Sequence, residues 1–215
     1  ATRVPQDLVT PIRALAVSTF HLIALGTTCI IDGNNSLKCW GLSERGVAGL
    51  QPFNLFLEAD DAPLYWDATS QATVVPGMGN AHRLALSPSD VCIRRPDTTM
   101  VCRGLNSWGA VGVSGSSGGS ERDVLSSATT ISSWGETVDL IQLSQHVGCA
   151  LSLDGSLQCA GHTHGGLLGN GYLRSSDGRP VQPLGLKPVR QVSVGDYNVC
   201  VVQIDGEVLC WGHNQ

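Results

Sequence analysis

Eight cysteines are the residues of this chain whose type and spacing specify chemistry most clearly. They fall into four pairs, and nine residues separate the two members of every pair. The pairs are Cys29 and Cys39, Cys92 and Cys102, Cys149 and Cys159, and Cys200 and Cys210. Four identical spacings among eight cysteines are not expected from chance. The chemistry that they indicate is the formation of disulfide bonds.

The residues between the paired cysteines predict a tight hairpin. A three-residue hairpin loop is commonly a type I turn followed by one residue in the left-handed region. Asp suits such a turn, and Gly or Asn suits the left-handed position. Thr98 fits that position poorly, because a β-branched residue resists positive φ. The four midpoints, each with the residue that follows it, are Asn34-Asn35, Asp97-Thr98, Asp154-Gly155 and Asp205-Gly206.

A loop centred there places the two cysteines of a pair opposite each other across an antiparallel ladder, within reach of a disulfide. The alternatives are buried free thiols or a zinc site. Zinc sites usually contain cysteines two to four residues apart, and this chain has no such pair. An alignment with Ile23 at the cysteine position leaves the pairing of Cys29 with Cys39 open. We expect four disulfides, and therefore an oxidising compartment, outside the cell or at its surface.

Other polar groups form no recognisable catalytic set. His162 and His164 make a His-x-His pair that a metal could use, but no third ligand lies nearby in the sequence. Glu58, Asp60 and Asp61 are typical of a solvated loop. The chain lacks a nucleophile elbow and a phosphate-binding Gly-x-x-x-x-Gly-Lys loop. We therefore expect no enzyme activity, no catalytic residue, no metal and no cofactor.

Two features indicate exposed surface. Phe53, Phe56, Tyr65 and Trp66 lie in one long insertion of a chain that is only 5% aromatic. They predict either a contact surface for a partner protein or simple packing over the edge of a sheet. Asn34-Asn35-Ser36 is an acceptor sequence for N-glycosylation at an expected hairpin tip, which makes Asn34 a candidate glycosylation site.

The elements that position these residues form a repeat. Cysteine pairs recur at intervals of 63, 57 and 51 residues. Each pair follows an alternating strand such as RALAVS or DLIQLS, and its second cysteine begins a Cys-x-Gly sequence. In three of the four units a Gly-x-x-Gly turn comes several residues later. Further short strands are expected around ATVVP and RPVQPL, and helical periodicity is lacking. The repeats cover about 12–75, 76–134, 135–185 and 186–215, and the last is incomplete.

Composition excludes several partners. The net charge is −5, and Lys and Arg do not cluster, which argues against nucleic acid and against an anionic membrane surface. No apolar run approaches the ~20 residues that span a bilayer.

The repeat resembles that of the regulator of chromosome condensation family, in its disulfide-bearing extracellular form. The resemblance is sharpest at Val192–Asn214, with VCVVQIDGEVLCWGHN, and at Leu140–Gly169. It implies an all-β fold, a β-propeller of four-stranded antiparallel blades. About four blades are present, so we expect part of a larger, seven-bladed ring; a closed four-bladed propeller is the alternative. The family includes a nucleotide exchange factor, a plant ultraviolet receptor and a secreted β-lactamase inhibitor, so the fold alone does not fix the function.

The expected function is that of a secreted or cell-surface, non-enzymatic module for protein interaction or structure in an extracellular assembly. Its partners would be other proteins of that assembly, or further copies or segments of the same propeller. A soluble ligand-binding propeller, either an enzyme inhibitor or lectin-like, is the alternative. Guanine nucleotide exchange is a third hypothesis, which predicts reduced cysteines and a basic arm.

Overall fold

The computed structural model describes residues 11–20, 25–44, 53–55, 64–114 and 124–213. The described residues form antiparallel β-sheets and two short 3-10 turns, and they contain no α-helix. The chain divides into two compact units, which are described separately. Unit 1 comprises residues 1–96, 101–105 and 124–129, and unit 2 comprises 97–100, 106–123 and 130–215. Among the described residues, no helix has the length and apolar character needed to cross a bilayer.

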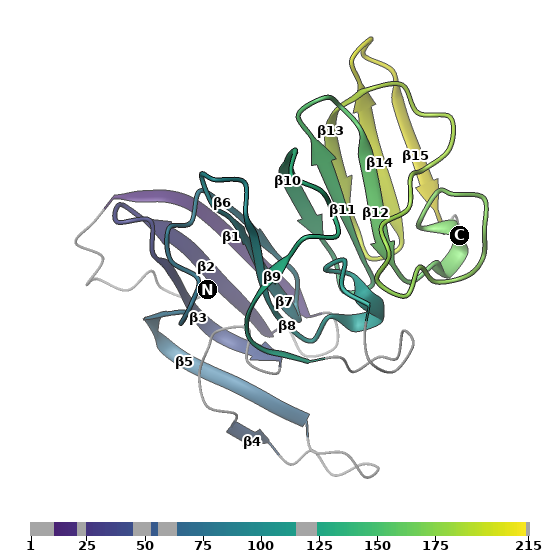
Figure 1. Ribbon diagram of the computed structural model, residues 1–215. Helices are drawn as coiled ribbons and strands as arrows, with labels where there is room; N and C mark the ends of the chain where they lie inside the picture. Colours follow the sequence, from purple (N-terminus) through teal and green to yellow (C-terminus); the bar gives the residue numbers. More distant parts are fainter. Residues whose placement is uncertain (1–10, 21–24, 45–52, 56–63, 115–123, 214–215) are drawn as a thin grey trace. The chain divides into compact units, whose positions relative to one another are not determined.

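Unit 1 is built on two sheets, which we call blades 1 and 2 (Figure 1). Blade 1 has the strand order β1-β2-β3-β5-β4, with β1 (Ile12–Phe20), β2 (Leu25–Asp32), β3 (Leu37–Glu44), β4 (Phe53–Leu55) and β5 (Leu64–Val74). Blade 2 has the order β6-β7-β8-β9, with β6 (Arg83–Leu86), β7 (Asp90–Arg94), β8 (Met100–Gly104) and β9 (Leu125–Ile131). Blade 2 is thus the four-stranded unit expected from the repeat, and blade 1 carries one short strand more.

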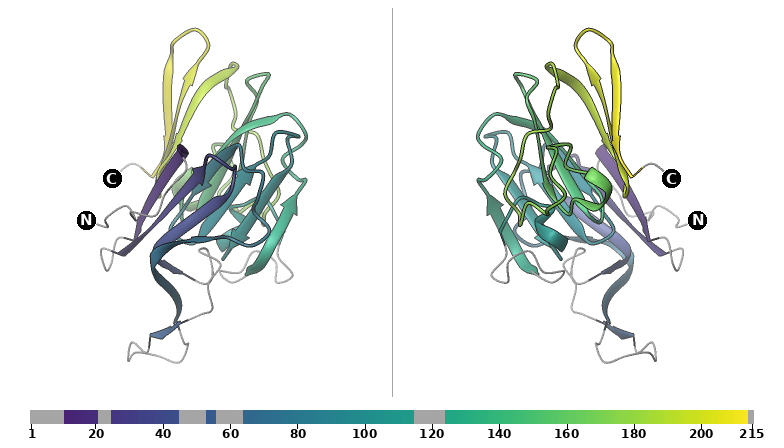
Figure 2. Two further views of the ribbon diagram at one scale, coloured as in Figure 1. Left: turned by 90° about the vertical axis from the view of Figure 1, so that its left-hand side faces the viewer. Right: turned by 90° about the vertical axis from the view of Figure 1, so that its right-hand side faces the viewer.

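Unit 2 holds blades 3 and 4, each a three-stranded sheet. Blade 3 contains β10 (Val138–Leu143), β11 (Val147–Ser152) and β12 (Leu157–Gly161). Blade 4 contains β13 (Val189–Val194), β14 (Asn198–Gln203) and β15 (Val208–Gly212), and its β14–β15 hairpin is the yellow ribbon in both views of Figure 2.

The strand expected around RPVQPL is reduced to one bridge. Val181 pairs with Cys159 through two backbone hydrogen bonds of 2.8 Å, and no longer strand forms there. Pro180 and Pro183 flank this bridge. Since proline has no N–H to donate, the ladder cannot extend through these positions.

The hairpin turns have the predicted backbone. Asn35, Thr98, Gly155 and Gly206 all have positive φ, at 59°, 72°, 83° and 91°. The aspartate before the left-handed residue closes three of these turns, since Asp97, Asp154 and Asp205 each accept a hydrogen bond at Oδ1 from the backbone N–H two residues later. Thr98 therefore adopts the conformation that its branched side chain disfavours.

All four cysteine pairs form disulfides across antiparallel partners. The Cα atoms of each pair lie 4.1–4.2 Å apart. Cys29 pairs with Cys39, so Ile23 does not take the cysteine position. Six of these cysteines are fully buried, whereas Cys210 is exposed and Cys200 is half-buried.

The burial follows from how consecutive blades pack. Within unit 1, the face of blade 1 that carries Cys29 and Cys39 packs with Val91, Ile93 and Val101 of blade 2 in one apolar core. Within unit 2, the face of blade 3 that carries its disulfide packs in the same way with blade 4; the strand residues involved are Val147, Cys149, Leu151, Leu157, Cys159, Val192, Val199 and Val201. The disulfide face of one blade is therefore covered by the opposite face of the next.

Candidate functional site

The aromatic surface predicted from the long insertion is only partly described. Phe53 lies in β4 directly opposite Trp66 of β5, and Tyr65 lies opposite Asn54 in the same ladder. Phe56 lies outside the described residues. The pairing brings two of the four aromatic positions together on the backbone, and the choice between a partner surface and packing stays a prediction.

The candidate glycosylation site lies on a hairpin tip. Asn34 is exposed, and its backbone N–H donates to Oδ1 of the buried Asp32 over 2.9 Å. Lys38 Nζ lies 2.9 Å from the other carboxylate oxygen of Asp32. Burial alone would raise the pKa of Asp32, but hydrogen bonds from Lys38, Ser36 and Asn34 hold this pKa below its ordinary value. The Asn34 side chain is thus presented on a braced turn, and its glycosylation remains a prediction.

A continuous row of five rings lies at one end of the strands of unit 2. We call this row the ring rim; in order it comprises Trp108, His162, His146, Tyr197 and His213. The distance between ring centroids is 4.3 Å from Trp108 to His162. The later steps are 6.3, 6.2 and 6.3 Å, and neighbouring rings are tilted by 44–55°. Tilted aromatic rings at 4.5–7 Å attract each other through edges and faces, so the row is a cohesive surface.

The rings are adjacent because each blade holds its pair with one backbone bond. His146 lies in the turn between β10 and β11, and His162 directly follows β12. The N–H of His162 donates to the carbonyl oxygen of His146 over 2.8 Å. In blade 4 the N–H of His213 donates to the carbonyl oxygen of Tyr197 over the same distance. His162 and His213 thus directly follow the ends of β12 and β15, which lie toward the lower edge of unit 2 in Figure 1.

One further bond joins the two turns that carry His146 and Tyr197. The backbone N–H of Gln145 donates to Oδ1 of Asp196 over 3.4 Å. Within blade 3, the Ser144 hydroxyl oxygen accepts the N–H groups of His146 and Val147 over 3.3 and 3.2 Å. The turns are therefore fixed by side chains as well as by the ladders.

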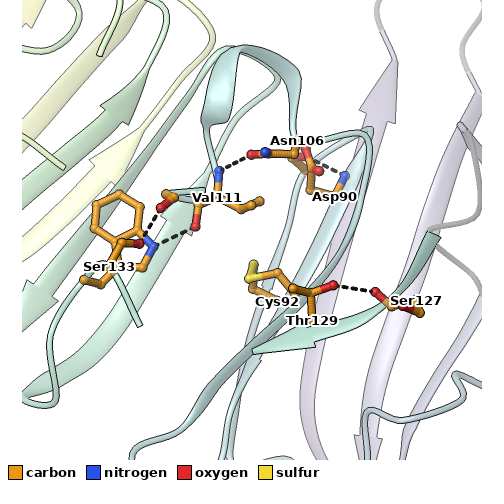
Figure 3. The surroundings of a disulfide bond; sticks show 11 residues. Asp90, Cys92, Asn106, Val111, Ser127, Thr129 and Ser133 are labelled. Carbon is orange, nitrogen blue, oxygen red and sulfur yellow. Dashed lines mark hydrogen bonds between the residues drawn. A yellow bond between two sulfur atoms is a disulfide. The ribbon is translucent and has the colours of Figure 1, made fainter. Parts of the chain in front are cut away.

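Trp108 reaches the row from the 3-10 turn η1 (Ser107–Gly109). Asn106, which is fully buried and has φ of 49°, braces this turn from inside. Its Oδ1 accepts the N–H of Val111 over 3.2 Å (Figure 3). Its Nδ2 donates to the carbonyl oxygen of Val113 over 3.1 Å. The indole N–H of Trp134 donates to the carbonyl oxygen of Val111 over 2.7 Å. Trp108 thus stands on a rigid support.

Trp108 itself has a backbone that tryptophan disfavours. Its φ is 56°, in the left-handed region where a bulky side chain is a genuine outlier. The matching position of the next turn, η2 (His164–Gly166), is Gly165 with φ of 62°. A Cβ on Gly165 would lie 2.8 Å from Cβ of His213, so this backbone touches the next blade directly. The same place in the repeat therefore holds a strained, half-buried indole in one turn and glycine in the other.

The rim is accessible and continues into an apolar loop. Tyr197 is 52% exposed, His213 is exposed, and Trp108, His146 and His162 are half-buried. The Thr163 hydroxyl, next to His162, donates to the carbonyl oxygen of Tyr172 over 3.0 Å. Tyr172 and Leu173 of that loop are 72% and 81% exposed. Accessible Trp and Tyr rings beside exposed apolar side chains are typical of protein-binding surfaces.

The described part of the chain contains no group of three or more His, Cys, Asp and Glu side chains arranged to hold a metal ion. The interactions that the rim offers are stacking, edge contacts and hydrogen bonds from imidazole and phenol groups. In the sequence His162 and His213 each stand three residues after the second cysteine of their pair, but this equivalence does not indicate which residues lie beside them. The signal was present at a second position, because His146 and Tyr197 each stand three residues before the first cysteine of their pair.

Comparisons with known proteins agree with this fold. Residues 189–215 match the model of the Regulator of chromosome condensation (RCC1) repeat. No curated protein sequence is similar enough to this chain to be matched to it.

Three solved structures resemble the chain over most of its length. Prp20p from Saccharomyces cerevisiae, studied for its binding to Gsp1p and histones, superposes with a TM-score of 0.77 at 18% identity, over 97% of this chain and 47% of its own. Yeast RCC1 (Prp20) bound to Kap60 gives 0.75 at 18% identity, over 97% and 45%. Human WBSCR16 gives 0.66 at 16% identity, over 87% and 45%. This chain therefore spans less than half of each of these proteins, and at such identities the likeness is one of fold.

Proposed function

We propose that this chain, whose fold is that of an RCC1-type β-propeller built of disulfide-bearing repeats, is a secreted or cell-surface, non-enzymatic protein-interaction module. The ring rim is its contact surface. The observation that carries the proposal is Trp108, a bulky residue held at positive φ where the neighbouring turn has glycine. Backbone strain of this kind costs of order 1–3 kcal/mol and clusters at functional sites.

The four disulfides support the extracellular location. Disulfides persist in oxidising environments and are rare in the cytosol and nucleus. They weigh against the nuclear nucleotide-exchange hypothesis, although Prp20p, with the same fold, binds Gsp1p and histones. What this chain shares with that protein is the propeller fold.

A soluble inhibitor or lectin-like propeller is the second candidate. The tilt of 44–55° between neighbouring rings favours a protein partner, since the rings offer edges and faces together rather than one flat platform. An inhibitor would use the rim in the same way as an assembly component, and would differ in the identity of the partner.

A photo-crosslinking experiment tests the proposal. A benzoylphenylalanine replaces Tyr197, and the unreduced protein is incubated with extracellular medium and cell surfaces of its source. The matched control carries the same group at Leu153, which is 70% exposed and follows the opposite end of β11. We expect a discrete crosslinked protein from position 197 only. Equal crosslinking from both positions, or none from either, contradicts the rim as the contact surface.

A further inference from the structure

Unit 2 contains a pocket of about 230 Å³ that the proposed function does not use. It lies beside the turn that joins β11 and β12, at the opposite end of these strands from the ring rim. Apolar and polar side chains share its walls, and the apolar ones are Leu157, Pro183, Leu186 and Pro188. Pockets for drug-sized ligands measure about 300–1,000 Å³, so this one fits a smaller molecule.

The repeat can fill this place, as the matching part of unit 1 demonstrates. In both units a backbone bond of 2.8 Å ties the incoming loop to the hairpin turn; it joins the N–H of Ala81 to the carbonyl oxygen of Asn35, and the N–H of Val189 to that of Gly155. Met78, three residues before Ala81, is fully buried in the apolar core. Leu186, three residues before Val189, is only half-buried and lines the pocket. The pocket is therefore a feature of this pair of blades, which the fold does not require.

Asp154 supplies an exposed carboxylate to the lining of the pocket. Its Oδ1 accepts hydrogen bonds from the hydroxyl of Ser156 over 2.7 Å and from the N–H of Ser156 over 2.9 Å. These bonds hold the pKa of Asp154 below its ordinary value, so the group is ionised at neutral pH. Both bonds use Oδ1, which leaves Oδ2 to accept a hydrogen bond from a ligand.

Lys187, the cationic residue of the lining, does not offset this charge, because its ammonium group is already paired. Its Nζ lies 2.6 Å from Oδ2 of Asp205 and 3.5 Å from Oε2 of Glu207. With Asp154, three carboxylates thus accompany one ammonium group, and the chain as a whole has a net charge of −5. The electrostatic potential at the pocket therefore favours a cation over an anion.

We propose that this pocket binds a small organic cation, in which an ammonium or guanidinium group is carried by a short apolar stem. The stem lies against the leucine and proline side chains, and the charged group donates a hydrogen bond to Oδ2 of Asp154. Such a ligand gains both from removal of apolar surface from water and from a charge-assisted hydrogen bond. The inference goes beyond the proposed function, since it concerns the other end of the strands that carry the ring rim.

The test titrates the intact, unreduced protein with pentylamine and follows its backbone amides by NMR at about pH 7, where an alkylamine is protonated. Pentanol and pentanoate have a similar stem without the positive charge, and methylamine has the charge without the stem. We expect saturable shifts at Asp154, Ser156 and Lys187. The affinity for pentylamine should exceed that for pentanol by about three- to fivefold, as for an exposed ion pair, and that for methylamine by about tenfold.

Matched variants separate the pocket from general charge effects. Asp154→Asn should lower the affinity for pentylamine to that for pentanol, and the turn should still form because Asn34 stands at the same position of the first hairpin. Asp97→Asn removes the matched carboxylate of the blade 2 hairpin, which does not line the pocket, and should leave the affinity unchanged. If Asp154→Asn does not fold, Leu186→Phe, which fills the pocket from its wall, should weaken the binding of pentylamine and pentanol alike.

Equal affinity for pentylamine and pentanoate overturns the inference, as does unchanged binding in a folded Asp154→Asn variant or in Leu186→Phe. Leu153, the control position for crosslinking, adjoins Asp154, so a protein captured there would contradict a small ligand. A failed titration together with a crosslink from Tyr197 refutes the pocket alone, and the converse result refutes the rim alone.

Discussion

The turns η1 and η2 occupy the same place in consecutive repeats, but the residue at their matching left-handed position differs. Both follow the last paired strand of a disulfide hairpin, both run into a Gly-x-x-Gly sequence, and both contain a residue with φ near 60°. In η2 that residue is Gly165, whose backbone touches His213. In η1 it is Trp108, whose ring lies 4.3 Å from that of His162 at a tilt of 53°.

The difference separates what the fold needs from what the surface offers. A repeat that can use glycine at this place does not need tryptophan for its backbone, because glycine adopts positive φ without a steric penalty. Trp108 gains contact with His162 and accessible aromatic surface, at the expense of backbone strain. The comparison is why the proposed function gives Trp108 a role in binding, and the predictions below test that role.

The largest expected effect comes from placing tryptophan in the turn that lacks it. Gly165→Trp should lower the free energy of unfolding by about 3 kcal/mol, because its Cβ would collide with Cβ and Cα of His213 and its φ is positive. Denaturant unfolding of the disulfide-intact protein measures this. A loss under about 0.5 kcal/mol would mean that the two turns are interchangeable and would break the comparison.

The reverse change tests function. Trp108→Gly should leave the free energy of unfolding within about 1 kcal/mol of the wild type, since relief of strain offsets lost packing. It should weaken binding of the partner captured at Tyr197 by about 2 kcal/mol, roughly thirtyfold. Calorimetric titration with that partner gives the affinity. Unchanged affinity, or a large loss of stability, would make Trp108 a structural residue.

Loss of Asn106, which braces η1, is expected to have a smaller effect on binding than loss of the Trp108 ring. Asn106→Ala removes two hydrogen bonds, to Val111 and Val113, from a fully buried side chain. It should cost about 1.5 kcal/mol of unfolding free energy. It should also lower partner affinity, because the turn no longer fixes Trp108. Thermal unfolding and the same titration measure both effects; loss of stability with full affinity would show that the turn need not be rigid.

The smallest expected effect comes from Thr98, a residue that also has an unfavourable positive φ but does not belong to the ring rim. Thr98 and Gly155 are the matched left-handed residues of the hairpin turns in blades 2 and 3. Thr98→Gly should raise the free energy of unfolding by about 1 kcal/mol, because a β-branched residue leaves a region that costs it roughly that much. Partner affinity should not change. If this variant alters binding while Trp108→Gly does not, the rim has been assigned to the wrong turn.

Much of the fold could be predicted because it depends on local rules. The spacing of Cys149 and Cys159, with Asp154-Gly155 between them, determined the turn, the register and the disulfide, since all three depend on residues adjacent in one hairpin. The reduction of the expected strand to one bridge at Val181 could not be predicted from such local rules. The apolar Val181 suggested a strand. The flanking prolines, which have no N–H to donate, limit the ladder there to a single bridge.

The sequence by itself determined the repeat, three of the four disulfide hairpins and the left-handed turn positions, because each follows from residues close together along the chain. Only the tertiary structure decided that Trp108, His162, His146, Tyr197 and His213 form one row. Those residues are up to about a hundred positions apart, and their contacts depend on blade 4 packing on blade 3. Such packing arises from apolar burial between sheets, which acts without regard to sequence distance and leaves no local pattern to read.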